Sequence, residues 1–376
     1  MRAFIRRILL LINILAAAAL VASYFSVYVS PASAWLFAFI SLAYPFLLLF
    51  NIFFIIWWLV FRKWYFLISV FCIALGWNAL RSTFQINLTS PPKIEDKNEI
   101  RVMTYNVRLF NYYQWTRDTS AWQRIADYIK EVNPDMVCFQ EFVTIPRSHH
   151  DLISLKQKMG RLLYSHVYYT DNIPGKINFG IATFSKHPII NKKMIKFEKS
   201  INGSISSDIV IRGDTVRIIN CHLQSIRLRK DYNDLIDSLL FNYSDRQLNE
   251  IKDISMRLRQ AYIRRANQVD ILAGEIKASP YPVILCGDFN DTPVSYTYRT
   301  VSRNMNDAFT ESGSGSGSTF RGKFPYGRID YVLFSPDFTS VSYHTGKEQW
   351  SDHYPVLVRL KLNEKAVGSD PRSRPK

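Results

Sequence analysis

Hydrophobic residues follow two different patterns along this chain of 376 residues, and the first pattern fills the N-terminal part. Three long apolar stretches cover Ile8–Val29, Ala34–Phe61 and Trp64–Leu80. A helix needs about 20 apolar residues to cross a membrane, so the first two stretches are long enough and the third is at the short end. The pattern predicts a membrane anchor over residues 1–90 with about three transmembrane helices. Pro45 predicts a kink in the second helix, which membrane helices tolerate.

A cleaved signal peptide is the alternative interpretation of the first stretch. Ala32-Ser33-Ala34 fits a small-residue cleavage site, whereas the apolar run from Ile8 exceeds the usual signal core of about 7–15 residues. Under either interpretation two apolar helices remain in the mature chain, and the polar part that follows lies outside the cytoplasm.

The second pattern runs from residue 99 to residue 363 and consists of short apolar runs, rich in β-branched residues, with a polar cluster at one end of each. Runs of this length and composition are typical of strands. The expected strands cover residues 100–107, 136–139, 216–219, 282–286, 331–334 and 355–362.

Helical periods separate some of these runs. Apolar residues repeat every three or four positions over 122–132, where Asn133-Pro134 stops the helix, and over 258–276, before Ser279-Pro280. A further short helix is expected over 232–240. Strands mixed with helices predict an α/β or α+β domain around a buried sheet. We expect this domain at 99–363, after a linker at 91–98 and before a disordered tail at 364–376.

The charge of the chain changes at the same boundary. From Met1 to Lys93 there is no acidic residue and there are seven basic ones. The remaining chain holds 40 Lys and Arg against 31 Asp and Glu, a net charge of +9. This sign favours anionic partners, such as phosphates, nucleic acid or acidic lipid headgroups, without choosing among them.

Basic residues also gather between residues 227 and 265, on expected helices. Arg257, Arg259, Arg264 and Arg265 belong to this group. A solvated helix face balanced by acids such as Asp253 is the expected arrangement, and contact with an anionic membrane or a phosphate backbone is the alternative.

Basic residues near the apolar stretches predict the orientation in the membrane, because loops rich in Lys and Arg stay in the cytoplasm. Arg2, Arg6 and Arg7 precede the first stretch, and Arg62-Lys63 separates the second from the third. Arg81 argues weakly in the other direction. Three spans then predict a multi-pass protein of the cell inner membrane, whose polar domain lies on the periplasmic or extracellular side.

The polar clusters contain residues suited to phosphate chemistry. Four acids, two amides and two histidines lie at the ends of apolar runs: Glu141, Asp288, Asp330, Asp352, Asn106, Asn290, His222 and His353. Oxygen-rich sets suit Mg²⁺ or Mn²⁺, which would neutralise a phosphate. An aspartate can deprotonate an attacking water, and an amide with a histidine can hold the developing charge. Each residue alone also fits a turn or a cap, so the interpretation depends on the combination.

Six motifs contain these residues, in this order along the chain: Thr104-Tyr105-Asn106-Val107-Arg108, Gln140-Glu141, Asn220-Cys221-His222-Leu223, Gly287-Asp288-Phe289-Asn290-Asp291, Arg328-Ile329-Asp330-Tyr331 and Ser351-Asp352-His353-Tyr354-Pro355-Val356. As a set they resemble the endonuclease/exonuclease/phosphatase superfamily of DNase I-like metal-dependent phosphoesterases, in a membrane-anchored bacterial form. The resemblance covers roughly residues 100–362. It implies a four-layer α/β sandwich, in which two packed mixed β-sheets are flanked by helices, and it implies dependence on Mg²⁺ or Mn²⁺.

The resemblance also implies roles at the metal and the substrate. Glu141 is expected to be the main metal ligand, with Asn106 beside it. Asp352 is expected to bind metal as well or to orient a histidine. Arg108 is expected to contact the substrate.

The other implied roles are catalytic. Asp288 is expected to activate the water, and Asn290 to bind the phosphate or the transition state. His222 and His353 are expected to contact the phosphate. Asp330 is expected to orient a histidine or to bind metal.

The function predicted on these grounds is divalent-metal-dependent hydrolysis of a phosphate ester, of the phosphodiesterase or nuclease type. A lipid or inositol phosphate phosphatase is the alternative within enzymes. A non-catalytic, membrane-tethered phosphate-binding module is the alternative of another class. The expected substrate is nucleic acid, a phospholipid headgroup or a small phosphoester, and no protein partner is expected. The aromatic residues Tyr112, Tyr113, Trp115 and Trp350 either line a substrate cleft or pack a core.

Overall fold

The computed structural model describes residues 2–87, 98–198, 200–226, 245–322 and 327–363. The expected linker at 91–98, apart from Asn98, lies outside the described residues, and so do the short helix at 232–240 and the tail at 364–376. The chain forms two compact units. One, the helical unit, comprises residues 1–84, 225–269 and 291–300, and the other, the sheet unit, comprises residues 85–224, 270–290 and 301–376.

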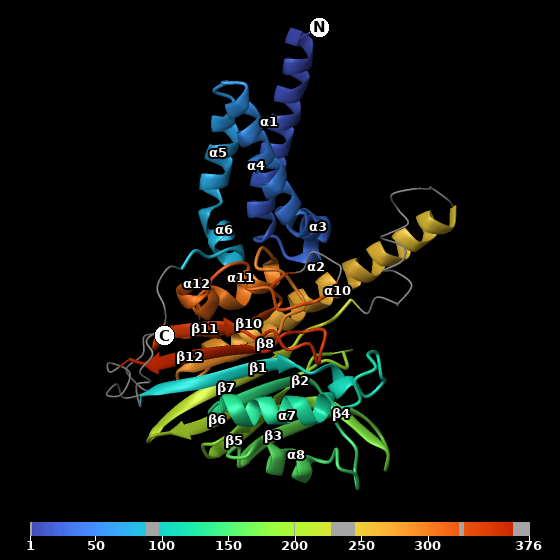
Figure 1. The fold of residues 1–376 in the computed structure, drawn as a ribbon, viewed down its shortest axis with the longest axis vertical. Helices are drawn as coiled ribbons and strands as arrows, with labels where there is room; N and C mark the ends of the chain where they lie inside the picture. The colour runs from blue at the N-terminus through green and yellow to red at the C-terminus, as the bar shows by residue number, and fades with distance from the viewer. Residues whose placement is uncertain (1, 88–97, 199, 227–244, 323–326, 364–376) are drawn as a thin grey trace. The chain divides into compact units, whose positions relative to one another are not determined.

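Six helices open the helical unit (Figure 1). They are α1 (Arg2–Ser26), α2 (Pro31–Ala34), α3 (Leu36–Leu42), α4 (Tyr44–Val60), α5 (Phe66–Leu75) and α6 (Trp77–Thr83). Within the described part of the chain, α1 alone is an unbroken helix that is long and apolar enough to cross a membrane. The pair α3 and α4 bends by 50°, and the pair α5 and α6 bends by 75°. By length and composition, the described residues therefore include one helix that could cross a membrane, or up to three if each bent pair is one span. Pro45 lies in the first turn of α4, directly after the first bend.

A buried polar network joins three of these helices. The Asn13 side-chain amide of α1 donates to the Ser69 hydroxyl of α5 at 2.7 Å, and that hydroxyl donates to Asn51 Oδ1 of α4 at 2.9 Å. The Trp58 indole of α4 donates to Asn13 Oδ1 at 2.9 Å. Polar links of this kind hold apolar helices together where the hydrophobic effect between them is weak. We conclude that α1, α4 and α5 form one bundle.

Segments from later in the chain belong to the helical unit as well: the part of α10 (Asp245–Lys277) up to Val269, and the segment 291–300 with most of α11 (Tyr296–Ser302). The Tyr262 ring of α10 packs against Phe39 of α3, with ring centroids 5.9 Å apart. Val294 packs in one cluster with Leu20 and Tyr44. The helical unit is therefore not only a set of apolar helices, and the domain boundaries expected at residues 90 and 99 remain a prediction.

One expectation about α10 is wrong. Arg265 was expected on a solvated helix face, but its side chain is fully buried, 3.2 Å from a carboxylate oxygen of Asp291. The Thr297 hydroxyl donates to the same carboxylate at 2.6 Å. Arg257 does lie at the surface, in an ion pair with Asp253 one turn away. The apolar contacts of α10 with the helical unit turn the Arg265 side of the helix inward.

The sheet unit holds two mixed six-stranded sheets (Figure 1). In spatial order the first contains β11 (Phe338–Thr345), β12 (Val356–Leu362), β1 (Glu99–Asn106), β2 (Met136–Thr144), β4 (Ile177–Ser185) and β3 (Tyr164–Ile173). The second contains β5 (Ile189–Ile195), β6 (Ser204–Ile211), β7 (Asp214–His222), β8 (Val283–Asp288), β10 (Asp330–Phe334) and β9 (Asn306–Asp307). The pairs β1–β2 and β7–β8 are parallel, and the other neighbours are antiparallel.

Alternation along the strands builds the layers. In β1, Ile100 and Val102 face the second sheet, in a cluster with Ile218 and Ile284, whereas the Met103 side chain lies on the opposite face. Successive strand residues point to opposite faces, so one apolar strand serves two cores. The core that contains Met103 packs against α7 (Ala121–Val132) and α8 (Leu152–Met159). The short helix α12 (Ala308–Ser312) lies near β9, β10 and β11. Two packed mixed sheets flanked by helices confirm the expected α/β architecture.

A buried polar bridge links the two sheets below one end of the sandwich. The Gln140 side-chain amide of β2 donates to Asn220 Oδ1 of β7 at 2.7 Å. The Asn220 amide in turn donates to the Ala182 carbonyl of β4 at 2.9 Å. All three residues are fully buried, so these groups depend on one another for hydrogen bonds. The bridge therefore holds in position the residues that follow it in β2 and in β7.

Candidate active site

Strand pairing brings most of the expected site residues to one edge of the sandwich. Asn106 at the end of β1 pairs with Gln140, directly before Glu141. Asp288 at the end of β8 pairs with His222 on one side and with Asp330 on the other. The two edges meet, because the Asn106 side-chain amide donates to Asp288 Oδ2 at 2.9 Å.

Gly287 makes the pairing of Asp288 with His222 possible. Its φ is +140°, and a Cβ atom at this position would lie 1.9 Å from the Cys221 carbonyl oxygen. Only glycine fits this close approach of two strands. Gly287, the glycine of the Gly-Asp-Phe-Asn motif, therefore allows the strand pairing that positions Asp288.

Asp288 lies at the centre of the site and is 1 % exposed. Asn106 and Asn290 donate side-chain amide hydrogens to its Oδ2 at 2.9 and 3.1 Å, and the Asn290 backbone N–H donates to its Oδ1 at 2.8 Å. Nε2 of His222 is 3.6 Å from Oδ2, and Nε2 of His353 is 3.8 Å from it. Burial raises the pKa of Asp288 above its usual value, against the opposing charge of His353 and the hydrogen bonds. A carboxylate with a raised pKa is a stronger base.

His353 and Asp330 form a buried pair. His353 Nδ1 lies 2.9 Å from Asp330 Oδ2. Burial lowers the pKa of His353, but the negative charges of Asp330 and Asp288 outweigh it and raise this pKa above its ordinary value. The imidazole is then protonated at neutral pH, with Nδ1–H donating to Asp330 and Nε2–H directed toward the Asp288 side of the site.

Glu141 and Asp352 form a second, more accessible group of acids, with side chains 34 % and 28 % exposed. Glu141 Oε1 accepts from the Asn106 amide at 3.4 Å and lies 3.8 Å from His222 Nε2. Desolvation raises the pKa of Glu141, and the nearby charge of Asp352 raises it further. A divalent cation relieves this repulsion, and Mg²⁺ prefers oxygen ligands while it keeps part of its water shell. This donor set fits Mg²⁺ or Mn²⁺.

A second group of side chains at the same edge also has potential ligand atoms close enough together to hold a metal ion. One potential ligand atom each from Asp288, Asp330 and His353 lies within 4.8 Å of the others, in the described part of the chain. All three residues are buried, and His353 Nδ1 is already engaged by Asp330. The site therefore offers a partly exposed acidic group and a buried one.

Arg108 begins a strained loop beside these acids. Arg108, Leu109, Phe110 and Asn111 all have positive φ, between 44° and 59°. The left-handed conformation costs about 1–2 kcal/mol for each non-glycine residue. The Arg108 backbone N–H donates to Asn106 Oδ1 at 3.0 Å, and its guanidinium lies 3.2 Å from Asp352. Such strain persists only where surrounding contacts determine the conformation, and it often marks functional sites.

Two residues outside the expected set of site residues support the site. The Ser351 hydroxyl donates to the Asn106 carbonyl at 2.8 Å and accepts from the His353 backbone N–H at 3.2 Å. The Thr319 hydroxyl accepts from the Asp330 backbone N–H at 3.1 Å. Ser351 stands in the last of the six motifs, directly before Asp352, whereas Thr319, which follows an alternating Gly and Ser stretch, gives no sequence signal.

The comparisons with solved structures show the fold. A structure described as an endonuclease/exonuclease/phosphatase from Beutenbergia cavernae DSM 12333 is 19 % identical, with a TM-score of 0.52 over 71 % of this chain and 72 % of that one. A structure with the same description from Bacteroides vulgatus is 18 % identical, with a TM-score of 0.51 over 71 % of this chain and all of that one. A family protein from Leptotrichia buccalis C-1013-b is 17 % identical, with a TM-score of 0.51 over 70 % and 99 %. None of the curated proteins matches.

Two family models match the sequence itself. A model of a domain of unknown function, DUF8431, matches residues 6–83, which include most of the apolar helices. The model of the Endonuclease/Exonuclease/phosphatase family matches residues 103–353, from β1 to the histidine paired with Asp330. This match spans more than half of the chain, and the chain therefore belongs to the endonuclease/exonuclease/phosphatase family.

Proposed function

We propose that this protein hydrolyses a phosphate ester, preferentially a diester, in a reaction that depends on a divalent cation. The observation that carries the proposal is the position of Asp288. Its carboxylate is buried, held by three amide N–H donors, and flanked by two histidines. A buried aspartate with only a structural role needs hydrogen-bond donors around its carboxylate. It does not also need two imidazoles within 4 Å.

Asp288 is the base in this proposal. The amides of Asn106 and Asn290 orient its carboxylate, so that one oxygen faces a water in line with the phosphorus. Asp288 takes the proton as the water attacks. Its raised pKa increases the driving force for that transfer.

The histidines and Asn290 oppose the charge that develops on the phosphate. Protonated His353 donates through Nε2–H to a phosphate oxygen or to the leaving oxygen, while Asp330 keeps its ring in place. His222 approaches from the other side, near Glu141 and Asp288. Donors fixed before the reaction need no reorganisation in the transition state.

Glu141, Asp352 and Asn106 would hold Mg²⁺ or Mn²⁺. When bound, the cation supplies neutralisation of the phosphate and of the leaving oxygen. Arg108 lies against Asp352 and is placed to contact the substrate as a second positive group. A non-catalytic phosphate-binding module has no use for a buried base beside two imidazoles, so this alternative is disfavoured.

We also propose that the helical unit anchors the protein with several spans and that the catalytic domain lies outside the cytoplasm. Within that unit Val294 packs with Leu20 and Tyr44, toward the end of α1 and the start of α4. Tyr65, beside the basic pair at 62–63, packs with Trp58 near the other end of α4. The basic residues at positions 2–7 and 62–63 thus share one end of the bundle, and residue 294 lies at the opposite end. Cytoplasmic placement of the basic end puts residue 294 on the other side.

The orientation is tested with C-terminal reporter fusions to the full chain. An alkaline phosphatase fusion, which folds only outside the cytoplasm, is expected to be active, and a green fluorescent protein fusion exported by the same route is expected to be dark. Bright fluorescence with an inactive phosphatase would place the catalytic domain in the cytoplasm and overturn the proposal.

The reaction is tested on the full chain in detergent with Mg²⁺, Mn²⁺ or a chelator. The substrates are single-stranded DNA, RNA, a phospholipid diester, an inositol phosphate and a simple phosphomonoester. We expect turnover that the chelator abolishes and that added Mg²⁺ or Mn²⁺ restores. Faster release of phosphate from the inositol phosphate than cleavage of any diester would favour the phosphatase alternative.

The Glu141→Gln variant tests the metal site in the same assay. We expect the Mg²⁺ concentration for half-maximal activity to rise more than about 10-fold, because even residues that only orient a metal ligand cost about 10–100-fold in affinity. Turnover that withstands the chelator, in the wild type or in this variant, would contradict a metal-dependent reaction.

A further inference from the structure

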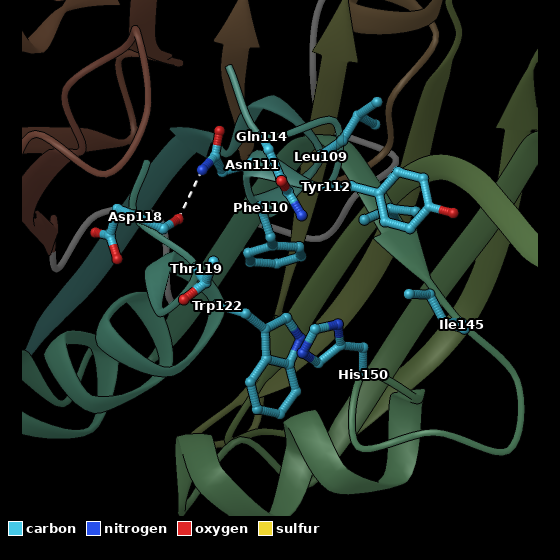
Figure 2. A pocket seen from close by; sticks show the side chains of 11 residues that line it. Leu109, Phe110, Asn111, Tyr112, Gln114, Asp118, Thr119, Trp122, Ile145 and His150 are labelled. Carbon is cyan, nitrogen blue, oxygen red and sulfur yellow. Dashed lines mark hydrogen bonds between the residues drawn. The ribbon is translucent and has the colours of Figure 1, made fainter. Parts of the chain in front are cut away.

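A pocket of about 270 Å³ opens in the sheet unit, next in sequence to the catalytic residues (Figure 2). The strained loop after Arg108 forms one wall, the start of α7 another, and the end of β2 with His150 the third. Leu109, the residue after Arg108, is its first lining residue. We call it the aromatic pocket, because Phe110, Tyr112 and Trp122 line it together with the His150 ring.

The aromatic pocket lies within reach of a substrate held at Glu141. Val143, two residues beyond Glu141 on β2, lines it. Two residues of chain span at most about 7 Å, so the two backbone positions lie within that distance. A group joined to the phosphate by a short linker therefore reaches the pocket while the phosphate stays among the catalytic residues.

Four of the eleven lining residues carry flat rings. The rings of Trp122 and His150 are stacked, with centroids 5.1 Å apart and planes at 26°. Figure 2 shows these two rings together below the loop that carries Phe110 and Tyr112. Burial, with the nearby charges of His149 and Lys158, lowers the pKa of His150, so its imidazole is neutral at pH 7. A neutral imidazole adds aromatic surface that carries both a donor and an acceptor.

Polar groups surround these rings. Gln114 and Thr119 line the aromatic pocket, and both residues are exposed. Asn111 has a different role, because its amide donates to the carbonyls of Thr116 and Asp118, at 3.0 and 2.6 Å, and closes the loop. With the left-handed backbone, these bonds build the pocket before any ligand arrives, which lowers the entropic cost of binding.

A nucleobase fits this combination better than the other groups that phosphate esters carry. It has flat faces that stack on aromatic rings and an edge of donors and acceptors. An acyl chain has no hydrogen-bonding edge to offer the Gln114 and Thr119 side chains, and a hydroxylated ring such as inositol is not flat. We propose that the aromatic pocket is a substrate subsite for a nucleobase, so that the enzyme acts on nucleotide phosphodiesters. This inference rests on the proposed phosphodiester hydrolysis at the adjoining site.

The test compares two diesters with the same leaving group, thymidine 5′-(p-nitrophenyl phosphate) and methyl p-nitrophenyl phosphate, on the full chain in detergent. Tyr112 is 42 % exposed, so Tyr112→Ala is expected to fold. Stacking of one base on an aromatic side chain predicts that this variant raises KM for the thymidine ester by about 5- to 100-fold, with kcat and the methyl ester unchanged. Tyr112→Phe is expected to retain the wild-type KM.

Tyr164→Ala is the matched control, because Tyr164 is 40 % exposed on β3 and lines no part of this pocket. Equal loss on both esters in Tyr112→Ala, or a wild-type enzyme that does not favour the thymidine ester, would overturn the proposal while metal-dependent cleavage stands. A Tyr112→Ala defect seen only with a phospholipid diester would assign the pocket to an acyl chain instead.

A binding measurement separates this proposal from the proposed reaction. If neither ester is cleaved, the reaction fails, and calorimetric titration with thymidine 5′-monophosphate still tests the aromatic pocket. Binding by the wild type that weakens at least about 5-fold in Tyr112→Ala would support the subsite. Equal binding by both proteins, or none by either, would overturn it.

Discussion

Replacing Asp288 with asparagine is expected to lower kcat for phosphate-ester hydrolysis by about 10²- to 10⁴-fold, the usual contribution of a positioned base. The amide has the volume of the carboxylate, so the packing around this buried residue is kept. It cannot accept a proton from water at neutral pH. The measurement is kcat and KM at saturating Mg²⁺, with thermal unfolding of the same sample to show that the variant is folded.

The control for this prediction is Asp171→Asn, on the exposed part of β3 and outside the residues proposed for catalysis, metal or substrate binding, which is expected to leave kcat unchanged. A loss of less than about tenfold in Asp288→Asn would mean that another group activates the water. His222, whose Nε2 lies 3.6 Å from the Asp288 carboxylate, would then be the next residue to test.

Replacing Asp291 with alanine is expected to destabilise the protein by about 3–5 kcal/mol, the cost of breaking a buried ion pair by removing one partner. Arg265 has no solvent exposure, and its guanidinium lies 3.2 Å from the Asp291 carboxylate. The change also removes the acceptor of the 2.6 Å hydrogen bond from Thr297. The measurement is thermal or denaturant unfolding of the full chain in one detergent, followed by a probe of the helical unit.

The same unit contains a matched ion pair at the surface. Asp253 and Arg257 are one helical turn apart on α10, 2.9 Å from each other, and each side chain is 38 % exposed. Asp253→Ala is expected to change the stability by less than about 1 kcal/mol, because water screens exposed pairs. Similar effects of Asp253→Ala and Asp291→Ala would show that burial of the second pair carries no energetic weight. The double change Arg265→Met with Asp291→Leu is expected to recover much of the loss.

The Arg265–Asp291 ion pair lies directly next in the chain to the proposed catalytic residues. Asp291 directly follows Asn290, whose backbone and side chain both donate to Asp288. The segment 291–300 belongs to the helical unit, where Val294 packs with Leu20 and Tyr44. A chain that begins near residue 95 lacks those partners for residue 294. Each experiment therefore uses the full chain.

The sequence by itself predicted the strands that lie next to the proposed site residues. The apolar runs expected at 100–107, 136–139, 216–219, 282–286, 331–334 and 355–362 correspond to β1, β2, β7, β8, β10 and β12. Five of these strands are largely buried on both faces, so their apolar pattern is easy to recognise, whereas β12 alternates between buried and half-buried residues. The helix expected over 122–132 is α7, and Asn133 ends it in the left-handed conformation that favours asparagine. The residues of the proposed site were also predicted from the sequence, because each lies at or next to an end of one of these runs, and their roles remain a prediction.

The sequence did not reveal the other six strands clearly. β5 is exposed along most of its length and carries Asn191, Lys192 and Lys193 in its middle. Its strand conformation comes from pairing with β6 and not from its composition. Strand preference depends strongly on neighbours, so edge strands of this kind have a weak local signal.

Only the tertiary structure decided how these parts meet. The bridge from Gln140 to Asn220 joins residues 80 positions apart, and the bond from Asn106 to Asp288 joins residues 182 apart. No local pattern encodes such distances. The left-handed loop at 108–111 opposes local preference and persists because contacts with Asn106 and Asp352 hold it. Local sequence thus determined which polar residues stand at the ends of these strands, whereas long-range packing decided their geometry, because contact energies between distant segments outweigh local preferences.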